Sequence, residues 1–390
     1  MMYEKEVKEK VTAILPQVVT WRRHFHEYPE LSGKEVKTSA YIQDVFKNLG
    51  IPYETGFFQN AVLGIIKGSH PGKTVALRAD MDALPVTELT GLPFASKNEG
   101  VMHACGHDGH MSILLGAAAV LNEMKDQIHG TVKIVFQPAE EEAAIGGHIA
   151  ASGKLDDVSE IYGLHVWPEL PTGQVGLKPG ALMAASDRFY VHIKGKSTHA
   201  AQPHNGTDAL VAAAHFIIDV QSLISREMNP MDNVVCTIGL MNAGTRYNVG
   251  VEDAYLEGTC RTYRPELRDK MEARLGEILK GLDVMFHTHS ELNYVRGHSA
   301  TINTPEKIDF LKKVGKAYLG EEHITEPEFP SMCAEDFSSY LEKFPGAFFW
   351  LGTGDGNTPA LHNASFAINE SILPLGITLE AAAALEALSR

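Results

Sequence analysis

Residues 74–80 read Thr-Val-Ala-Leu-Arg-Ala-Asp, a short apolar segment that follows Pro71–Gly72 and ends on an acidic residue. Its length and composition predict a buried strand. Similar strands are expected at residues 131–136, 161–164 and 347–351. Helices are expected at residues 3–15, 34–48, 107–125, 305–318 and 372–388. Since strands and helices alternate, the chain is predicted to be an α/β protein whose mostly parallel central sheet is flanked by helices on both faces.

A different pattern begins near residue 185. Residues 187–194 alternate between polar and apolar side chains, as in a half-exposed strand. A helix (206–226), two strands (233–238 and 254–259), a helix (265–282) and a strand (284–295) are predicted to follow. The order β-α-β-β-α-β is typical of a small ferredoxin-like α+β domain. We therefore predict a main domain in two parts, residues 1–185 and 297–390, with a second domain of residues 186–296 inserted between them.

The composition excludes several classes of protein. The chain of 390 residues has 34 Lys and Arg against 49 Asp and Glu, which gives a formal net charge of −15. Binding to nucleic acid or to an anionic membrane needs a basic surface, so neither is expected. No apolar run reaches the ~18 residues of a membrane span, and the N-terminus lacks the apolar stretch of a signal peptide. Four cysteines without a CxxC pair indicate a reducing compartment, so we expect a cytoplasmic protein.

Four polar clusters stand near the ends of the predicted strands of the main domain. Residues 103–110 read His-Ala-Cys-Gly-His-Asp-Gly-His and precede a helix. The other clusters are Glu140–Glu142, His165 and His362, each at or beyond the end of a strand. Because the carboxyl ends of parallel strands share one edge of an open α/β sheet, these side chains are expected to converge there.

Thiolate, imidazole and carboxylate groups together indicate a site for Zn²⁺ or a similar divalent transition metal. Five or more candidate ligands exceed a single tetrahedral site, and two ions that share a ligand would use them all. Neighbouring side chains of an extended segment diverge, so one of the adjacent glutamates can bind metal while the other acts as a general base. Asp80 and Asp82 would orient the imidazole ligands.

Taken singly, each cluster has a simpler explanation. A His-Cys pair in a glycine-rich loop is more often structural, and three glutamates often begin a helix, where their charge favours the helix dipole. Cys105 beside three histidines is better explained as a metal ligand than as a nucleophile. The absence of GxSxG, GxxxxGK(S/T) and HExxH motifs disfavours serine hydrolase, nucleotide-binding and zincin mechanisms. The remaining cysteines, Cys236, Cys260 and Cys333, are interpreted as core or loop residues.

Several motifs together resemble one family of enzymes. They are residues 22–26 (Arg-Arg-His-Phe-His), 29–32 (Pro-Glu-Leu-Ser), 78–85 (Arg-Ala-Asp-Met-Asp-Ala-Leu-Pro), 102–110, 136–141 (Phe-Gln-Pro-Ala-Glu-Glu), 197–204 (Ser-Thr-His-Ala-Ala-Gln-Pro-His), 256–262 (Leu-Glu-Gly-Thr-Cys-Arg-Thr) and 334–337 (Ala-Glu-Asp-Phe). Nearly end to end, the sequence resembles the co-catalytic metallopeptidases that include aminoacylases, hippurate hydrolases and plant hormone-conjugate amidohydrolases. The His-Ala-Cys-Gly-His-Asp block with the later Gln-Pro-Ala-Glu-Glu is specific to this branch.

The resemblance implies a role for each matching residue. The two-metal ligand set would be Cys105, His107, Glu141, His165 and His362. Glu140 would be the general base, and His199, supplied by the neighbouring subunit of a homodimer, would polarise the substrate carbonyl. Asn248 and Arg261 fall near the substrate-binding region of the family. The two parts of the main domain would then be the catalytic domain, and the inserted domain would be a lid and dimerisation domain.

The chain departs from the family pattern at three positions. Glu142 follows the paired glutamates where glycine is usual, Gly250 interrupts the usual Asn-Val-Ile-Pro, and Cys333 replaces a glycine before Ala-Glu-Asp-Phe. A third carboxylate at position 142 either alters the metal preference or points to solvent. The other two changes leave the ligand set intact but affect the predicted substrate pocket.

The activity implied is hydrolysis of the amide bond of N-acyl amino acids, such as N-acetyl amino acids, with two divalent ions per chain from among Zn, Mn, Co and Ni. Glu140 would take a proton from a metal-activated water and pass it to the leaving nitrogen. A dipeptidase or carboxypeptidase of the same family is one alternative. A metal-dependent binding protein and a structural site with one ion are the others. The expected partners are a small N-acyl amino acid or short peptide and a second copy of the chain.

Overall fold

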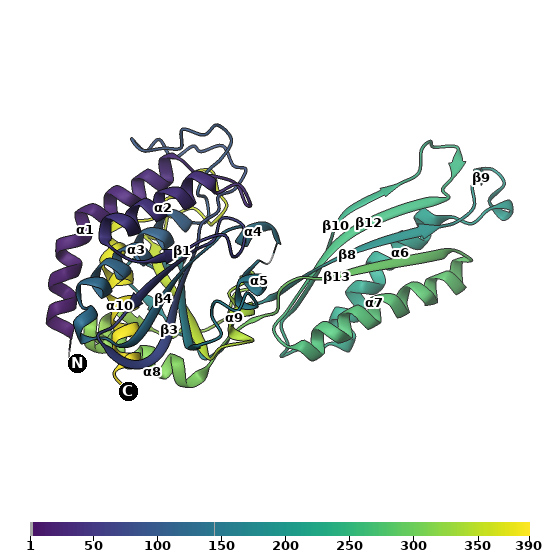
Figure 1. Cartoon of the computed structure of the whole chain (residues 1–390). Coiled ribbons are helices and arrows are strands. Elements are labelled where there is room, and N and C mark those ends of the chain that lie inside the picture. Colours follow the sequence, from purple (N-terminus) through teal and green to yellow (C-terminus); the bar gives the residue numbers. More distant parts are fainter. Residues whose placement is uncertain (1–2, 144) are drawn as a thin grey trace. The chain divides into compact units, whose positions relative to one another are not determined.

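The computed structural model describes residues 3–143 and 145–390, which form two compact units (Figure 1). Unit 1 comprises the chain up to Leu182 together with Ile302–Phe329 and Asp336–Arg390. Unit 2 comprises Met183–Thr301 and Pro330–Glu335. The chain passes from unit 1 to unit 2 after Leu182 and returns after Thr301. These positions lie within a few residues of the ends of the predicted inserted domain, residues 186–296.

The short segment Pro330–Glu335 belongs to unit 2, although the sequence analysis left it in the main domain. Met183 forms a parallel bridge with Ser331, and the Ala184 N–H donates to the Cys333 carbonyl at 2.9 Å. These contacts join residues that are about 150 positions apart in the chain, so no local pattern indicates them.

Unit 1 is built on an eight-stranded sheet in the order β1-β2-β4-β3-β5-β16-β6-β15. The strands are β1 (Tyr53–Glu54), β2 (Val62–Lys67), β3 (His70–Asp80), β4 (His129–Gln137), β5 (Val158–Pro171), β6 (Val175–Gly176), β15 (Ile324–Thr325) and β16 (Gly346–Gly354). β3 runs parallel to β4 and β5, and β16 runs parallel to β5. The mostly parallel centre confirms the prediction of an α/β protein with a mostly parallel central sheet. β2, which was not predicted, pairs antiparallel with β4.

β5 runs well past residue 164, where the sequence analysis ended this strand. His165 therefore lies inside the strand and not at its end. The reason is the neighbouring strand β16, whose register pairs Trp350 with His165 and Gly352 with Trp167. This ladder keeps the chain extended beyond residue 164.

The long helices of unit 1 are α1 (Glu4–Glu27), α2 (Val36–Leu49), α3 (His107–Glu123), α8 (Pro305–Tyr318) and α10 (Leu373–Leu388). α1 continues through Pro16, whereas the sequence analysis ended it at residue 15. A proline inside a helix costs roughly 3 kcal/mol. Val11, Val18 and Phe25 on the same helix are buried, and burial of each such side chain contributes about 1.5–3 kcal/mol. Packing of the apolar face therefore outweighs the proline.

α3 and α10 lie in the core of unit 1. Every residue of α3 from His107 to Leu121 is buried. Gly116 permits close helix packing, because a Cβ there would lie 2.9 Å from Ile377 of α10 and 3.0 Å from Val18 of α1. The start of α3, which carries the His-Cys segment, is thus fixed by its surroundings.

Among the described residues, two helices are long and apolar enough to cross a membrane by length and composition, Ala209–Glu227 and Glu370–Leu388. Both helices contain charged residues, such as Asp219 and Glu380, so neither is an uninterrupted apolar run. The apolar window of Glu370–Leu388 is 78% buried inside the fold and that of Ala209–Glu227 is 33% buried. A core helix passes the same test, so these helices are weak evidence for a membrane span.

Unit 2 has a four-stranded antiparallel sheet in the order β10-β12-β8-β13 (Figure 1). Its elements are β8 (Ala185–Lys194), α6 (Ala209–Ser222), β10 (Val234–Ala243), β12 (Asp253–Thr262), α7 (Pro265–Phe286) and β13 (His289–Arg296). Phe189, Val191 and Ile193 of β8 are buried in one core with Phe216 of α6 and Leu275 of α7. Both helices therefore cover the same face of the sheet. A two-stranded sheet of β9 (Thr198–His199) and β11 (Val249–Gly250) completes the unit.

Candidate metal centre

The carboxyl ends of β3 and β4 bring acidic residues to one edge of the central sheet. Asp80, the last residue of β3, pairs in register with Gln137, the last residue of β4. Asp82 follows β3, and the short helix α4 (Glu140–Ala143) follows β4. This edge thus carries two aspartates and the adjacent glutamates, as expected from the sequence.

The His-Ala-Cys-Gly-His segment turns into the site at a glycine. Gly106 has a φ of +86°, and a Cβ there would lie 2.4 Å from Val166 Cγ2. Only glycine fits a position that is both left-handed and this crowded. The turn starts α3 and leaves Cys105 and His107 on either side of Gly106, both buried.

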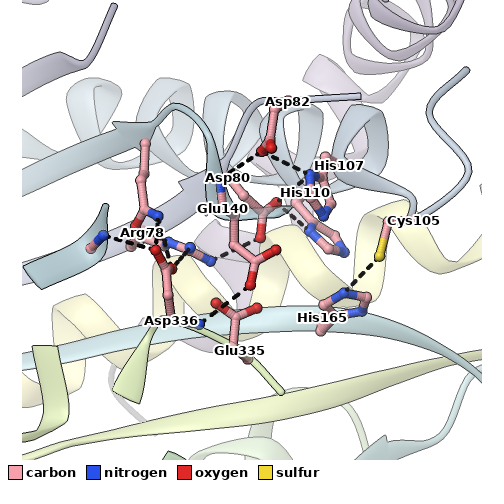
Figure 2. A network of polar contacts seen from close by, with 12 residues as sticks. Arg78, Asp80, Asp82, Cys105, His107, His110, Glu140, His165, Glu335 and Asp336 are labelled. Atoms are coloured by element: carbon pink, nitrogen blue, oxygen red, sulfur yellow. Dashed lines mark hydrogen bonds and ion pairs between the residues drawn. The ribbon is translucent and has the colours of Figure 1, made fainter. Parts of the chain in front are cut away.

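The structure brings together all five residues expected to bind metal. The ligand atoms of Cys105, His107 and His165 lie within 4.8 Å of one another, and so do those of Cys105, Glu141 and His362. Figure 2 shows Cys105 and His165 facing each other beside His107. Glu141 Oε1 lies 3.2 Å from His362 Nε2 and 3.9 Å from His107 Nε2. Since Cys105 belongs to both groups, the arrangement has the form of two adjoining three-ligand sites.

Buried atoms without hydrogen-bond partners indicate that a cation belongs here. Both ring nitrogens of His107 and Oε1 of Glu141 are buried and make no hydrogen bond within the described residues. Such atoms are destabilising by roughly 1–3 kcal/mol each unless something binds them. Burial opposes protonation of His107, but Asp80, Asp82 and Glu141 outweigh it and raise its pKa to about 10. A potential that favours a proton this strongly also favours metal cations, so the residues fit two divalent ions.

His165 is oriented by a backbone carbonyl. Its Nδ1–H donates to the Val166 carbonyl at 2.7 Å, which leaves Nε2 facing Cys105 Sγ at 3.4 Å. Burial and the neighbouring His110 lower the pKa of His165 well below its usual value. The ring is therefore neutral, and its Nε2 lone pair is directed at the centre of the ligand group, as is usual for a metal-binding histidine.

His110, the third histidine of the segment, has no ring nitrogen left for a metal. Its Nδ1–H donates to Asp80 Oδ1 at 2.6 Å, and its Nε2 accepts the Val166 N–H at 2.9 Å. Asp80 was expected to orient a ligand imidazole, but its short hydrogen bond is to His110. Asp82 Oδ1 lies closer than Asp80 Oδ1 to His107 Nδ1, at 3.5 against 3.8 Å.

Cys105 must lose its proton to bind a metal. Burial, and then the charges of Glu141 and Glu140, raise the pKa of the Cys105 thiol well above its usual value. Such a thiol stays protonated at neutral pH, which argues against a free nucleophile. Binding of a divalent ion would release this proton.

Glu140 is held at its backbone and at its carboxylate (Figure 2). Its N–H donates to Asp82 Oδ1 at 3.1 Å, and the Glu141 N–H donates to Asp82 Oδ2 at 3.0 Å. Its Oε1 accepts the Asp336 N–H at 3.3 Å. A carboxylate oxygen of Glu140 also lies within 4.8 Å of ligand atoms of His107 and Glu141. Glu140 thus stands beside the candidate ligands, where a general base is required.

A buried ion-pair network beside Glu140 was not predicted. Arg78 donates to Asp80 Oδ2 and to Asp336 Oδ1, each at 2.8 Å (Figure 2). Gln137 donates to both oxygens of Asp336, and the Gly146 N–H donates to Asp336 Oδ2 at 2.8 Å. An arginine inside an otherwise apolar strand was the available signal, because a buried guanidinium needs acidic partners.

His362 reaches the site from a loop in an unusual backbone conformation. Its φ is +65°, and its N–H donates to the Ala104 carbonyl at 2.8 Å. Its side chain is 53% exposed, so this side of the centre is open to solvent. Strained residues of this kind are enriched at functional sites.

His199 and Asn248 lie side by side in unit 2. His199 of β9 is the register partner of Val249 of β11, and the Asn248 carbonyl accepts the Ala200 N–H at 3.1 Å. His199 Nδ1 accepts the Ala201 N–H at 3.1 Å, so the neutral ring carries its proton on Nε2. The imidazole is exposed, with this N–H available as a donor.

Arg261 does not join this pair within unit 2. It pairs with Ser186 at one end of β8, whereas Asp253 of the same strand pairs with Lys194 at the other end. Eight residues of strand span roughly 27 Å. β9 and β11 adjoin the Lys194–Asp253 end in the chain, so the structure separates Arg261 from His199.

The three departures from the family pattern have different surroundings. Glu142 is exposed, which supports the interpretation that it points to solvent. Gly250 packs against β9, where a Cβ would lie 2.9 Å from Thr198 Cγ2. Cys333 is exposed.

Comparison with known proteins gives consistent results. A model of peptidase family M20/M25/M40 matches residues 76–386. N-acetyl-L-cysteine deacetylase of Bacillus subtilis (strain 168) is 39% identical over 357 residues, which is 92% of this chain and 85% of the relative. Thermostable carboxypeptidase 1 of Saccharolobus solfataricus is 35% identical over 389 residues, 98% of each chain. The crystal structure of Bacillus subtilis YXEP protein, a dinuclear metal binding peptidase from the M20 family, matches with a TM-score of 0.86 and 34% identity over 97% of this chain and 99% of that one.

Proposed function

This chain belongs to peptidase family M20/M25/M40, and we propose that it is a metal-dependent amidohydrolase that cleaves the amide bond of N-acyl amino acids. The observation that carries the proposal is the convergence of two adjoining ligand groups beside an acid, Glu140, that belongs to neither. A structural metal site closes all its ligands around one ion. The additional carboxylate and the exposed side of the centre favour catalysis.

In this proposal Cys105, His107 and His165 hold one ion, and Glu141 and His362, with Cys105 shared, hold the other. When bound, two divalent ions lower the pKa of a water molecule and polarise the acyl carbonyl. Thiolate, imidazole and carboxylate ligands suit Zn, Mn, Co or Ni, and we propose the native metals from this set.

Glu140 performs the proton transfers. Its carboxylate takes a proton from the attacking water as the new C–O bond forms, and returns it to the nitrogen as the C–N bond breaks. The products are a carboxylate and a free amino acid, and Glu140 ends the cycle ionised. The Asp336 N–H and the carboxylate of Asp82 keep Glu140 oriented during both transfers.

Unit 1 is then the catalytic domain, and unit 2 is a lid and dimerisation domain. The exposed Nε2–H of His199 suits donation to the acyl oxygen as negative charge develops on it. We propose a homodimer in which His199 of the partner subunit serves each centre. Leu210, Val211 and Ile218 on α6 are exposed apolar residues that supply contact area for such an interface.

The second candidate function is cleavage of short peptides, as a dipeptidase or carboxypeptidase. It is favoured by the 35% identity to thermostable carboxypeptidase 1. The amide chemistry at the centre would be the same, so only the groups that bind the acyl and amino-acid parts separate the two. A non-catalytic binding protein is disfavoured because Glu140 is present and oriented.

A substrate panel tests the proposal. The purified protein is stripped with a chelator, reloaded in turn with Mn²⁺, Zn²⁺, Co²⁺ and Ni²⁺, and assayed for release of free amino acid. We expect kcat/KM for N-acetyl-L-cysteine, N-acetyl-L-methionine or hippurate to exceed that for dipeptides and for a C-terminal peptide bond. Higher values for the peptides would support the second candidate. No amide hydrolysis with any metal would contradict both.

A further inference from the structure

The turn that carries Glu140 and Glu141 rests on an acid that the sequence analysis did not select. Glu35, at the start of α2, is 0% exposed. Its Oε1 accepts the N–H groups of Gly33 and Ala139, each at 2.8 Å. Its Oε2 accepts a hydrogen bond from Asn60 Nδ2 at 3.2 Å. The carboxylate thus joins the segment before α2 to the residue that precedes the catalytic glutamate.

Ala139 adopts a backbone conformation that it would not choose alone. Its φ is +52°, and only 3% of its surface is exposed. A left-handed conformation is unfavourable for a non-glycine residue by roughly 1–2 kcal/mol, so it persists only where neighbouring groups hold it. Its N–H is buried and needs an acceptor, and the acceptor that the structure provides is Glu35.

The next two residues are held in the same manner. The N–H groups of Glu140 and Glu141 donate to the two oxygens of Asp82. Three successive backbone N–H groups therefore donate to two buried carboxylates. This set of hydrogen bonds fixes where the side chains of Glu140 and Glu141 begin, and a shift of about 1 Å at reacting groups can reduce a rate by about 100-fold.

We propose that Glu35 is a positioning residue for the Glu140–Glu141 pair: its buried carboxylate accepts the Ala139 N–H and holds the left-handed turn that aims both glutamates into the metal centre. The inference deepens the proposed function and rests on it for the role of Glu140. Glu35 does not touch the reacting atoms in this scheme. It acts through the backbone of Ala139.

The hydrogen-bond pattern defines how variants should behave. Both backbone donors use Oε1, so a glutamine at position 35 keeps this acceptor, and the amide of Asn60 can turn to match the new NH₂ group. Alanine removes the acceptor. A glycine at position 139 adopts a positive φ without penalty, so it lessens the need for Glu35.

Glu30 offers a matched control. Its Oε2 accepts the N–H and the hydroxyl of Thr38, at 2.8 and 3.0 Å, so it also anchors the first turns of α2. Within the described residues, the Glu30 carboxylate makes no hydrogen bond to the turn at residues 139–141. Glu30→Ala should therefore lower stability without altering the centre.

The test compares Mn²⁺ titration calorimetry with steady-state kinetics at saturating Mn²⁺. For Glu35→Ala we expect about 10- to 100-fold weaker Mn²⁺ binding at the Glu141 site and a kcat lower by a similar factor, with KM within about twofold. Glu35→Gln should stay within about threefold of wild type in both readouts. Adding Ala139→Gly to Glu35→Ala should recover part of both losses. Glu30→Ala should match wild type in both.

Two results would overturn the proposal: Glu35→Ala with wild-type Mn²⁺ affinity and kcat, or Glu35→Gln as impaired as Glu35→Ala. If Glu35→Ala does not fold, Glu35→Met, which fills similar space without an acceptor for the Ala139 N–H, takes its place, and wild-type Mn²⁺ affinity and kcat would overturn the proposal. Wild-type protein that binds Mn²⁺ but hydrolyses no N-acyl amino acid would contradict the proposed function alone, because the titration tests Glu35 without substrate.

Discussion

The sheet edge of unit 1 and the β9–β11 end of unit 2 hold their candidate residues in different ways. At the sheet edge Asp82 fixes two backbone N–H groups, and His165 is fixed by a carbonyl. In unit 2 His199 is exposed, and Asn248 Oδ1 makes no hydrogen bond within the described residues. The first region is preorganised for chemistry within one chain. The second presents the exposed His199 imidazole to solvent, which fits the proposed dimer, whereas Asn248 Oδ1 is buried.

The largest expected effect on kcat comes from replacing Glu140, the proposed general base at the sheet edge of unit 1. Glu140→Gln should lower kcat by about 10²- to 10⁴-fold, because the amide cannot accept the proton of the attacking water. The number of Mn²⁺ ions bound, measured by elemental analysis, should not change. The exposed neighbour provides the control, since Glu142→Gln should keep nearly full activity. A Glu140→Gln protein within tenfold of wild type would show that another group transfers the proton.

The second region is tested by His199→Ala. Loss of a donor to the developing oxyanion should lower kcat by about 10²- to 10³-fold, with Mn²⁺ binding unchanged. Mixing this variant with Glu140→Gln under subunit exchange should restore activity that neither has alone, because mixed dimers contain one intact centre. If the mixture stays inactive while exchange is verified, His199 does not act across subunits.

The smallest effect is a change of stability with pH. His26 is buried between Asp108 and Glu88, at 2.8 and 3.1 Å, and burial opposes its charge, but Asp108 and Glu88 outweigh burial and raise its pKa to about 9. A group with a raised folded pKa stabilises the fold fully below the unfolded value of 6.5 and loses this effect as pH rises through about 9. The difference in Tm between wild type and His26→Gln should therefore be largest near pH 6 and shrink by pH 9.

The control for this titration lies in unit 2. His192 pairs with Asp253 at 2.8 Å on the sheet face away from α6 and α7, and its side chain is 34% exposed. His192→Gln should change Tm far less than His26→Gln near pH 6, because exposed pairs contribute little. A Tm difference for His26→Gln that is the same at pH 6 and pH 9 would contradict a buried imidazolium.

The parts of the fold predicted best are those set by local patterns. Short apolar runs indicated β3 and β4, and helical periodicity indicated α1 and α2, since burial of one face acts within each segment. The candidate ligands followed from their places near strand ends. The run of β5 through His165 could not be predicted, because it depends on pairing with a strand almost 190 residues later.

The hydrogen-bond partners that hold the site in place could not be predicted from local sequence patterns either. Arg78 and Asp336 are 258 positions apart, and Glu35 and Ala139 are 104 apart. The distinction between His107 and His110 depends on which nitrogens already have partners. Only three-dimensional placement decides that, because the two histidines are alike in sequence context.

In the proposed enzyme, two cations share the edge of the sheet formed by the carboxyl ends of β3 and β4. The most direct measurement is a crystal structure of Mn²⁺-loaded protein with anomalous scattering recorded at the manganese edge. We expect two anomalous peaks per chain, one among Cys105, His107 and His165 and one among Cys105, Glu141 and His362. A single peak, or peaks away from these side chains, would contradict the proposed two-ion centre.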